Sequence, residues 1–198
     1  MGVIVCGYQG IGKSTVAKDI PNIIDLESSS FYGADEKTRP ENWAYFYVKI
    51  AIDQALRGND VFLSCHDSVR EQLYLQYHDL YDEERSYVAP LVIIPAIELK
   101  KEWGNRLLDR YFISLEPKDR RAYEFHTKEF ETNVNELISN TSLPLPTIFI
   151  RDINYDLREL IYNYLINADD KYNCRYLKWR RRRGGRYNAG RTEVCSES

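Results

Sequence analysis

The chain has no long hydrophobic run. None of its 198 residues fall in a stretch that approaches the roughly 18 to 20 uninterrupted apolar residues of a membrane span. The N-terminus opens on a short strand-like run instead of a charged and then apolar leader. We therefore expect a soluble, cytoplasmic protein without a membrane partner.

Cysteine is also scarce, with four residues and no C-x-x-C spacing among them. Cys6 and Cys65 lie inside apolar runs, where a free cysteine behaves as a small hydrophobe. The other two, Cys174 and Cys195, are near the C-terminus. We expect all four to be reduced, with neither a zinc site nor a disulfide.

Negative charge predominates only in the first part of the chain. The net charge is −3, yet residues 168–198 hold nine Lys and Arg against four acids, which leaves 18 bases and 26 acids for residues 1–167. The negative charge of residues 1–167 disfavours nucleic-acid binding by that part of the chain, whereas the positive charge of residues 168–198 leaves it open for the tail. The run from Trp179 through four arginines to two glycines predicts a flexible arm. We therefore divide the chain into one domain, residues 1–167, and a basic C-terminal tail, residues 168–198.

Within residues 1–167, short apolar runs alternate with helical patterns. The runs predicted as strands are residues 3–6, 23–26, 61–65, 90–94 and 147–150. The segments predicted as helices are residues 12–19, 41–57, a segment beginning near 67, and residues 98–111, 118–139 and 155–166. Strands that alternate with helices form βαβ units, so the pattern predicts an α/β fold with a five-stranded parallel sheet flanked by helices.

The most specific motif follows the first strand. Residues 7–15, Gly-Tyr-Gln-Gly-Ile-Gly-Lys-Ser-Thr, fit the G-x-x-x-x-G-K-[ST] pattern between a strand and a helix. Glycines allow backbone N–H groups to surround phosphate oxygens, and the helix N-terminus adds positive potential. The residues expected to hold the phosphates of ATP are Gly7, Gln9, Gly10, Ile11, Gly12, Lys13, Ser14 and Thr15. Lys13 is expected to reach the outer phosphates and Ser14 to bind Mg²⁺; the alternative is a glycine turn that binds nothing.

With its additional Gly10, the loop resembles the G-x-x-G-x-G-K-[ST]-T form of the P-loop kinase superfamily. The similarity is to nucleoside monophosphate kinases and to gluconate- and shikimate-kinase-like enzymes, and it covers the order of elements through about residue 166. It implies a P-loop NTPase fold of the nucleoside monophosphate kinase type, with a small helical lid. It also implies that ATP and Mg²⁺ serve transfer of the γ-phosphoryl group to a small acceptor.

Acidic residues follow two of the predicted strands. Asp25 and Glu27 end the second strand, where shikimate-kinase-like enzymes carry an acidic pair. Asp25 is expected to orient Mg²⁺ through water or to accept the proton of the attacking hydroxyl, and Glu27 to contact the acceptor. Asp67, after the third strand, competes for the metal; it is equally suited to capping the next helix. The alternative for Asp25 and Glu27 is a strand-end acid that caps a turn.

Two segments are candidates for binding the acceptor. Residues 63–70 resemble the strand-to-helix segment that touches the acceptor in gluconate kinases, and Arg70 has a planar fork suited to a phosphate or carboxylate. Residues 28–47 occupy the position of the acceptor-binding insert of nucleoside monophosphate kinases. Arg39 and Trp43 there suit a base that stacks and carries a phosphate. A solvated arginine and core aromatics are the alternatives.

Arg106 and Arg110 are four residues apart and so share one helix face. P-loop kinases have a lid whose arginines neutralise the transferring phosphoryl group, and this segment resembles a small helical lid without metal. The alternative is an ordinary charged amphipathic helix, and Arg120 and Arg121 are a second candidate pair.

The motifs together favour an ATP-dependent kinase whose acceptor is a nucleoside or nucleoside monophosphate. A sugar-acid kinase and a polynucleotide 5′-kinase, in which the tail would hold the strand, are alternatives in the same class. A different class is a nucleotide-binding module that uses the loop to govern assembly. The sequence has no unmistakable Walker B strand, in which four apolar residues lead directly into an aspartate, and this leaves the metal-binding acid open.

Overall fold

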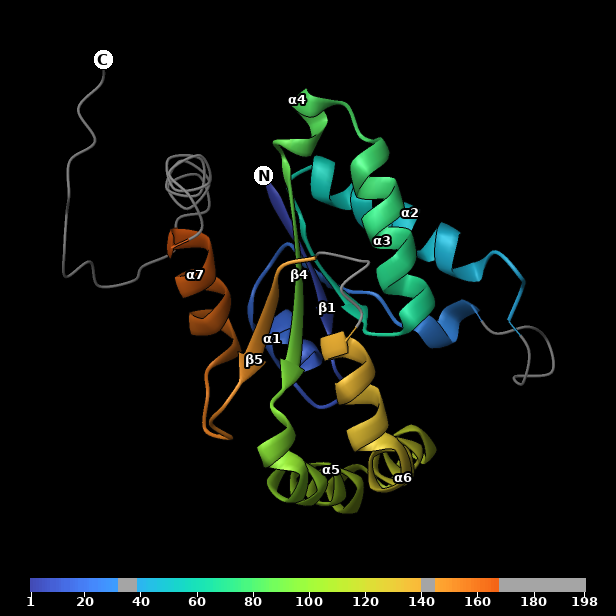
Figure 1. Cartoon of the computed structure of the whole chain (residues 1–198), viewed down its shortest axis with the longest axis vertical. Coiled ribbons are helices and arrows are strands. Elements are labelled where there is room, and N and C mark those ends of the chain that lie inside the picture. The colour runs from blue at the N-terminus through green and yellow to red at the C-terminus, as the bar shows by residue number, and fades with distance from the viewer. Residues whose placement is uncertain (32–38, 140–144, 168–198) are drawn as a thin grey trace.

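The computed structural model describes residues 1–31, 39–139 and 145–167 (Figure 1). The predicted basic tail, residues 168–198, lies outside the described residues, and with it Cys174 and Cys195; residues 32–38 of the segment 28–47 also lie outside them. No helix in the described part of the chain is long and apolar enough to cross a membrane.

Five parallel strands form one sheet in the order β2-β3-β1-β4-β5. Their bounds are β1 Gly2–Gly7, β2 Ile23–Asp25, β3 Asp60–Ser64, β4 Val88–Pro95 and β5 Thr147–Ile150. The all-parallel α/β prediction is confirmed, with strand ends shifted by one or two residues. Every residue of β1 and β4 is buried, because strands covered by helices on both faces are apolar throughout.

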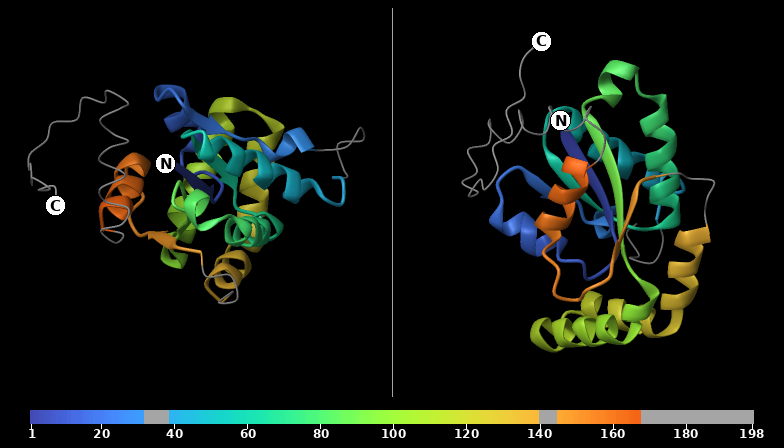
Figure 2. Two further views of the ribbon diagram at one scale, coloured as in Figure 1. Left: turned by 90° about the horizontal axis from the view of Figure 1, so that it is seen from above. Right: turned by 60° about the vertical axis from the view of Figure 1, so that its left-hand side comes forward.

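Helices cover both faces of the sheet (Figures 1 and 2). On one face lie α1, Lys13–Asp19, and α7, Leu157–Asn167; on the other lie α2, Trp43–Leu56, and α3, Asp67–Asp79. Gly58 follows α2 with φ 87°, the left-handed conformation with which helices commonly end, as its sequence predicted. The core includes the fully buried side chains of Trp103, Tyr47 and Phe62.

A helical pair crosses the carboxyl ends of the strands. It consists of α5, Lys100–Ser114, and α6, Pro117–Ser139, which pack against each other below the tip of β4 in Figure 1. The sequence did not predict α4, Asp82–Arg85, or the 3₁₀ turn η1, Ser28–Phe31, and the start of the helix predicted over residues 98–111 is a separate 3₁₀ turn, η2, Ile97–Leu99. Each is one turn long, too short to show helical periodicity in the sequence.

Candidate functional site

The order of the strands indicates where a ligand is expected to bind. From β1 the chain goes to β2 at the edge, returns to β3 beside β1, and then crosses to β4 on the other side of β1. In open α/β sheets, ligands bind outside the carboxyl ends of the strands at such a reversal. Residues 7–15, here called the glycine-rich loop, leave β1 at this point and lead into α1.

The backbone of the glycine-rich loop depends on two glycines with positive φ. Gly10 has φ 86° and Gly12, the residue before α1, has φ 93°, a region that side chains with a Cβ rarely adopt. A Cβ at Gly10 would lie 2.8 Å from Leu107 Cδ2. Ile11 is buried beneath the loop, and Thr15 is exposed on the first turn of α1. The loop thus brings the first N–H groups of α1, which have no partner within the helix, to the strand ends.

Lys13 folds back over the glycine-rich loop. Its Nζ donates a hydrogen bond of 2.8 Å to the carbonyl oxygen of Gly7. Burial lowers the pKa of Lys13, and the nearby carboxylate of Asp25 acts against this shift. An ammonium group held among protein atoms in this way gains strongly from an anion that enters the loop.

Ser14 and Asp25 meet at the start of α1. The Ser14 hydroxyl donates a 2.5 Å hydrogen bond to Asp25 Oδ2, which joins the glycine-rich loop to the end of β2. Hydroxyl and carboxylate oxygens are the ligands that Mg²⁺ prefers, and this ion usually keeps several waters. The described residues contain no group of three or more His, Cys, Asp or Glu arranged to hold a metal. Ser14 and Asp25 fit an ion that is otherwise held by water and phosphate.

Asp67 has a different partner. It is the first residue of α3, with His66 at the N-cap position, so the capping role considered from the sequence is not the one that the structure shows. Its carboxylate forms an ion pair with Arg70 one turn later. Of the two acids predicted to bind Mg²⁺, Asp25 is therefore the one that is hydrogen-bonded to Ser14.

Arg39 and Trp43, which the sequence predicts to bind the acceptor, interact with each other. The guanidinium of Arg39 lies 4.0 Å from the centre of the Trp43 ring, and its Nη2 donates to Ser28 Oγ at 3.2 Å. The Trp43 ring also packs near Phe31 and Tyr47. Trp43 is therefore part of an aromatic cluster, the alternative that the sequence left open, with Arg39 over one of its faces.

Arg70 is the most buried cation near the strand ends, with 5% of its surface exposed. Its Nε is buried and has no hydrogen-bond partner among the described residues. Glu27 is exposed after β2 and lies close enough to Lys13 to act on its charge. The Nε atoms of Arg85, Arg110 and Arg158 are in the same state, so the unpaired Nε of Arg70 does not by itself indicate a ligand.

His66 lies beside Trp43 and close enough to Arg39 and Lys13 to be affected by their charges. Its ring packs edge-on against Trp43 with centres 5.7 Å apart. Desolvation by the surrounding protein, followed by the positive charges of Arg39 and Lys13, lowers its pKa to about 4, although the residue as a whole is exposed.

We expect the His66 imidazole to titrate near pH 4 in the folded protein, well below the ordinary value of about 6.5. Because the unfolded chain binds this proton first, folding stability from His66 falls as the pH drops from about 6.5 to about 4 and changes no further below it. NMR titration of the ring protons measures the midpoint. His66→Gln assigns the signal, and a midpoint near 6.5 would contradict the environment described.

The two arginines of α5 have different surroundings. The Arg106 guanidinium carbon lies 5.4 Å from the Trp103 ring and 5.2 Å from the Tyr155 ring, and its Nη2 is 3.9 Å from the position of a Cβ on Gly12. Arg110 instead forms a 2.8 Å ion pair with the buried Asp119 of α6. Arg106 therefore lies beside the glycine-rich loop, whereas Arg110 forms an ion pair that links α5 to α6.

This arrangement is suited to a polyphosphate bound with a divalent cation. A helix N-terminus, an ammonium group and a guanidinium surround the loop, and a hydroxyl paired with a carboxylate lies at its end. Comparison of the chain with protein-family models and with curated proteins found no match.

Two aromatic residues at the loop were not predicted from the sequence. Trp103 Nε1 donates to the carbonyl oxygen of Gln9 at 2.9 Å, and the Tyr155 hydroxyl donates to that of Ile11 at 2.8 Å. The side chain of Gln9 in turn donates to the Ala122 carbonyl oxygen of α6 at 3.0 Å. In the sequence, nothing distinguishes these aromatics from core residues, since their partners are backbone atoms far along the chain.

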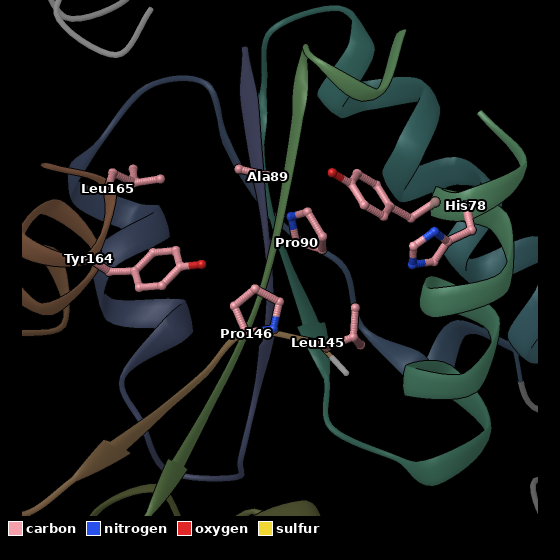
Figure 3. Close-up of a pocket in the computed structure, with 8 residues that line it drawn as sticks. His78, Ala89, Pro90, Leu145, Pro146, Tyr164 and Leu165 are labelled. Atoms are coloured by element: carbon pink, nitrogen blue, oxygen red, sulfur yellow. The ribbon is translucent and has the colours of Figure 1, made fainter. Parts of the chain in front are cut away.

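A separate hollow lies near the start of β4, at the end of the sheet opposite the glycine-rich loop (Figure 3). It is lined by His78 from α3, Pro90 from β4 and Tyr164 from α7, with other apolar groups. Its described lining contains no lysine or arginine, so it lacks the chemistry for holding a phosphate.

Proposed function

We propose that this protein is an ATP-dependent phosphotransferase of the P-loop kinase type. The acceptor is a small molecule, a nucleoside or nucleoside monophosphate. The observation that carries the proposal is the glycine-rich loop at the carboxyl end of the central strand, with Lys13 folded over it and Ser14 bound to Asp25. These groups support the proposal, because catalysis of phosphoryl transfer consists mostly of positioning the reactants and neutralising phosphate charge.

The residues have separate roles in this proposal. Lys13 leaves the Gly7 carbonyl to bind the outer phosphates, and Ser14 supplies a hydroxyl to Mg²⁺, which would neutralise phosphate charge there. Asp25 orients the metal through water or accepts the proton of the attacking hydroxyl. Arg106, beside Gly12, adds positive charge where the phosphoryl group is transferred.

The acceptor belongs on the other side of the site, toward the ends of β2 and β3. Arg39, which is supported by Trp43 and Ser28, and the buried Arg70 supply positive charge there. Of the two proposed acceptors, these arginines favour a nucleoside monophosphate over an uncharged nucleoside, because a planar guanidinium binds phosphate through paired donors.

A panel of acceptors with γ-labelled ATP tests the proposal. It contains nucleosides, nucleoside monophosphates, sugar acids and an oligonucleotide with a free 5′-hydroxyl. We expect label to pass to a nucleoside or nucleoside monophosphate, at a rate that saturates with acceptor. Transfer to a sugar acid or an oligonucleotide would support the corresponding alternative kinase. Hydrolysis of ATP at a rate independent of every acceptor would favour the nucleotide-binding module instead.

Replacing Arg106 and Arg110 one at a time separates stabilisation of transition-state charge from stabilisation of the fold. Arg106→Ala is expected to lower kcat about 10²-fold, the order seen when one preorganised donor to a transition state is removed. Arg110→Ala is expected mainly to lower the melting temperature, because it leaves the buried Asp119 carboxylate without its cation. Both kcat and Tm are measured for each variant. An unchanged kcat in Arg106→Ala would support the alternative interpretation of α5 as an ordinary charged amphipathic helix.

A further inference from the structure

Two side chains that are distant in the sequence bind the outer side of the glycine-rich loop. Trp103 comes from α5 and Tyr155 from the connection between β5 and α7. Their hydrogen bonds end on the carbonyl oxygens of Gln9 and Ile11, at 2.9 and 2.8 Å. The carbonyl groups of two loop residues, separated by one residue, are thus held by donors from outside the loop.

These donors are themselves held rigidly. The rings of Trp103 and Tyr155 are stacked with centres 6.1 Å apart and planes 9° from parallel, and the Arg106 guanidinium lies against both. Trp103 is fully buried, and Tyr8 packs edge-on against its ring. Burial raises the pKa of Tyr155 to about 12, so its hydroxyl remains a hydrogen-bond donor at neutral pH.

The peptide geometry transmits this constraint to the N–H groups of the loop. In a trans peptide the C=O and the following N–H point in opposite directions, and the described chain contains no cis peptide. The Gln9 carbonyl shares its peptide with the Gly10 N–H, and the Ile11 carbonyl shares its peptide with the Gly12 N–H. Holding both carbonyls outward therefore turns both N–H groups toward the opposite, inner side of the loop.

We propose that Trp103 and Tyr155 are positioning residues that orient the Gly10 and Gly12 N–H groups for phosphate binding. This inference rests on the proposed function, since it assigns the inner side of the loop to a bound polyphosphate. A loop whose donors are already oriented loses less conformational freedom when the anion binds, and so binds it more tightly. The same two rings keep Arg106 beside Gly12, which couples the loop to α5.

Tyr155→Phe is the cleanest test, because it removes the hydroxyl and keeps the ring that stacks on Trp103. The matched control is Tyr74→Phe, which removes a hydroxyl from α3 on the other face of the sheet. Two quantities are measured: hydrogen exchange of the Gly10 and Gly12 amides in the ligand-free protein, and the Kd for inorganic tripolyphosphate with Mg²⁺.

In Tyr155→Phe we expect faster exchange at Gly10 and Gly12, unchanged exchange in β4, and a Kd about three- to tenfold higher, the effect of losing one neutral hydrogen bond. Tyr74→Phe should match the wild type in both measurements. Trp103→Phe, provided that it folds, should shift the same two quantities in the same direction. A Tyr155→Phe variant with wild-type exchange at both glycines and wild-type Kd would overturn the positioning role. Failure of the wild type to bind tripolyphosphate would overturn the proposed function itself, independently of any variant.

Discussion

Lys13→Ala is expected to lower kcat for phosphoryl transfer by about 10²-fold or more while the protein stays folded. The ammonium group supplies charge to the outer phosphates, and loss of one such preorganised group removes several kcal/mol of transition-state stabilisation. Among the described residues, the hydrogen bond of this group is to the Gly7 carbonyl. The loss should therefore appear in catalysis and not in the fold.

Stability gives the second readout for this variant. Burial lowers the pKa of Lys13, which means that the folded protein holds the charged form less favourably than the unfolded chain does. Removing the ammonium group should leave Tm equal to that of the wild type or higher. Lys18→Ala, at the exposed end of the same helix, is the matched control and should keep both kcat and Tm. An unchanged kcat in Lys13→Ala would refute the role given to the loop.

Asp25→Asn is expected to lower kcat by about 10²-fold with a smaller effect on nucleotide affinity. The acid is proposed to act on the metal or on the attacking hydroxyl during transfer, and such general-base roles contribute on the order of 10²- to 10⁴-fold. An asparagine oxygen can still accept the Ser14 hydrogen bond, so the start of α1 should keep its position.

Asp67→Asn is the comparison for Asp25→Asn, because both acids follow strands of the sheet. Its carboxylate is paired with Arg70, and so we expect this variant to change acceptor KM more than kcat. Steady-state kinetics with each substrate varied in turn separate the two effects. If Asp67→Asn lowers kcat and Asp25→Asn does not, the magnesium assignment belongs to Asp67.

The sequence predicted the sheet and the placement of the loop because both depend on local patterns. Apolar runs such as residues 90–94 show a buried parallel strand directly, and the glycine pattern of residues 7–15 requires a strand before it and a helix after it. The proximity of Asp25 to the loop also followed from a local rule, since parallel strands end at one edge of the sheet. These features need no knowledge of long-range side-chain contacts.

The distinction between Arg106 and Arg110 could not be predicted in this way. Both lie on one helix face, and only the packing of α6 shows that Asp119 engages one of them. Trp103 and Tyr155 were missed for a related reason, because their partners are carbonyl groups 94 and 144 residues away. For Trp43 the sequence leaves base stacking and core packing open, and it does not show that Arg39 covers one face of the ring.

The most direct test of the central claim is to follow the backbone amide resonances of ¹⁵N-labelled protein by NMR as Mg²⁺ and ATP are added. We predict saturable shifts that are largest for Gly10, Gly12, Lys13 and Ser14, and their loss in Lys13→Ala at the same ATP concentration. Inorganic tripolyphosphate should produce the same pattern in these four amides. Saturable shifts confined to other parts of the protein, or no shifts at millimolar ATP, would contradict the assignment of this loop as the nucleotide site.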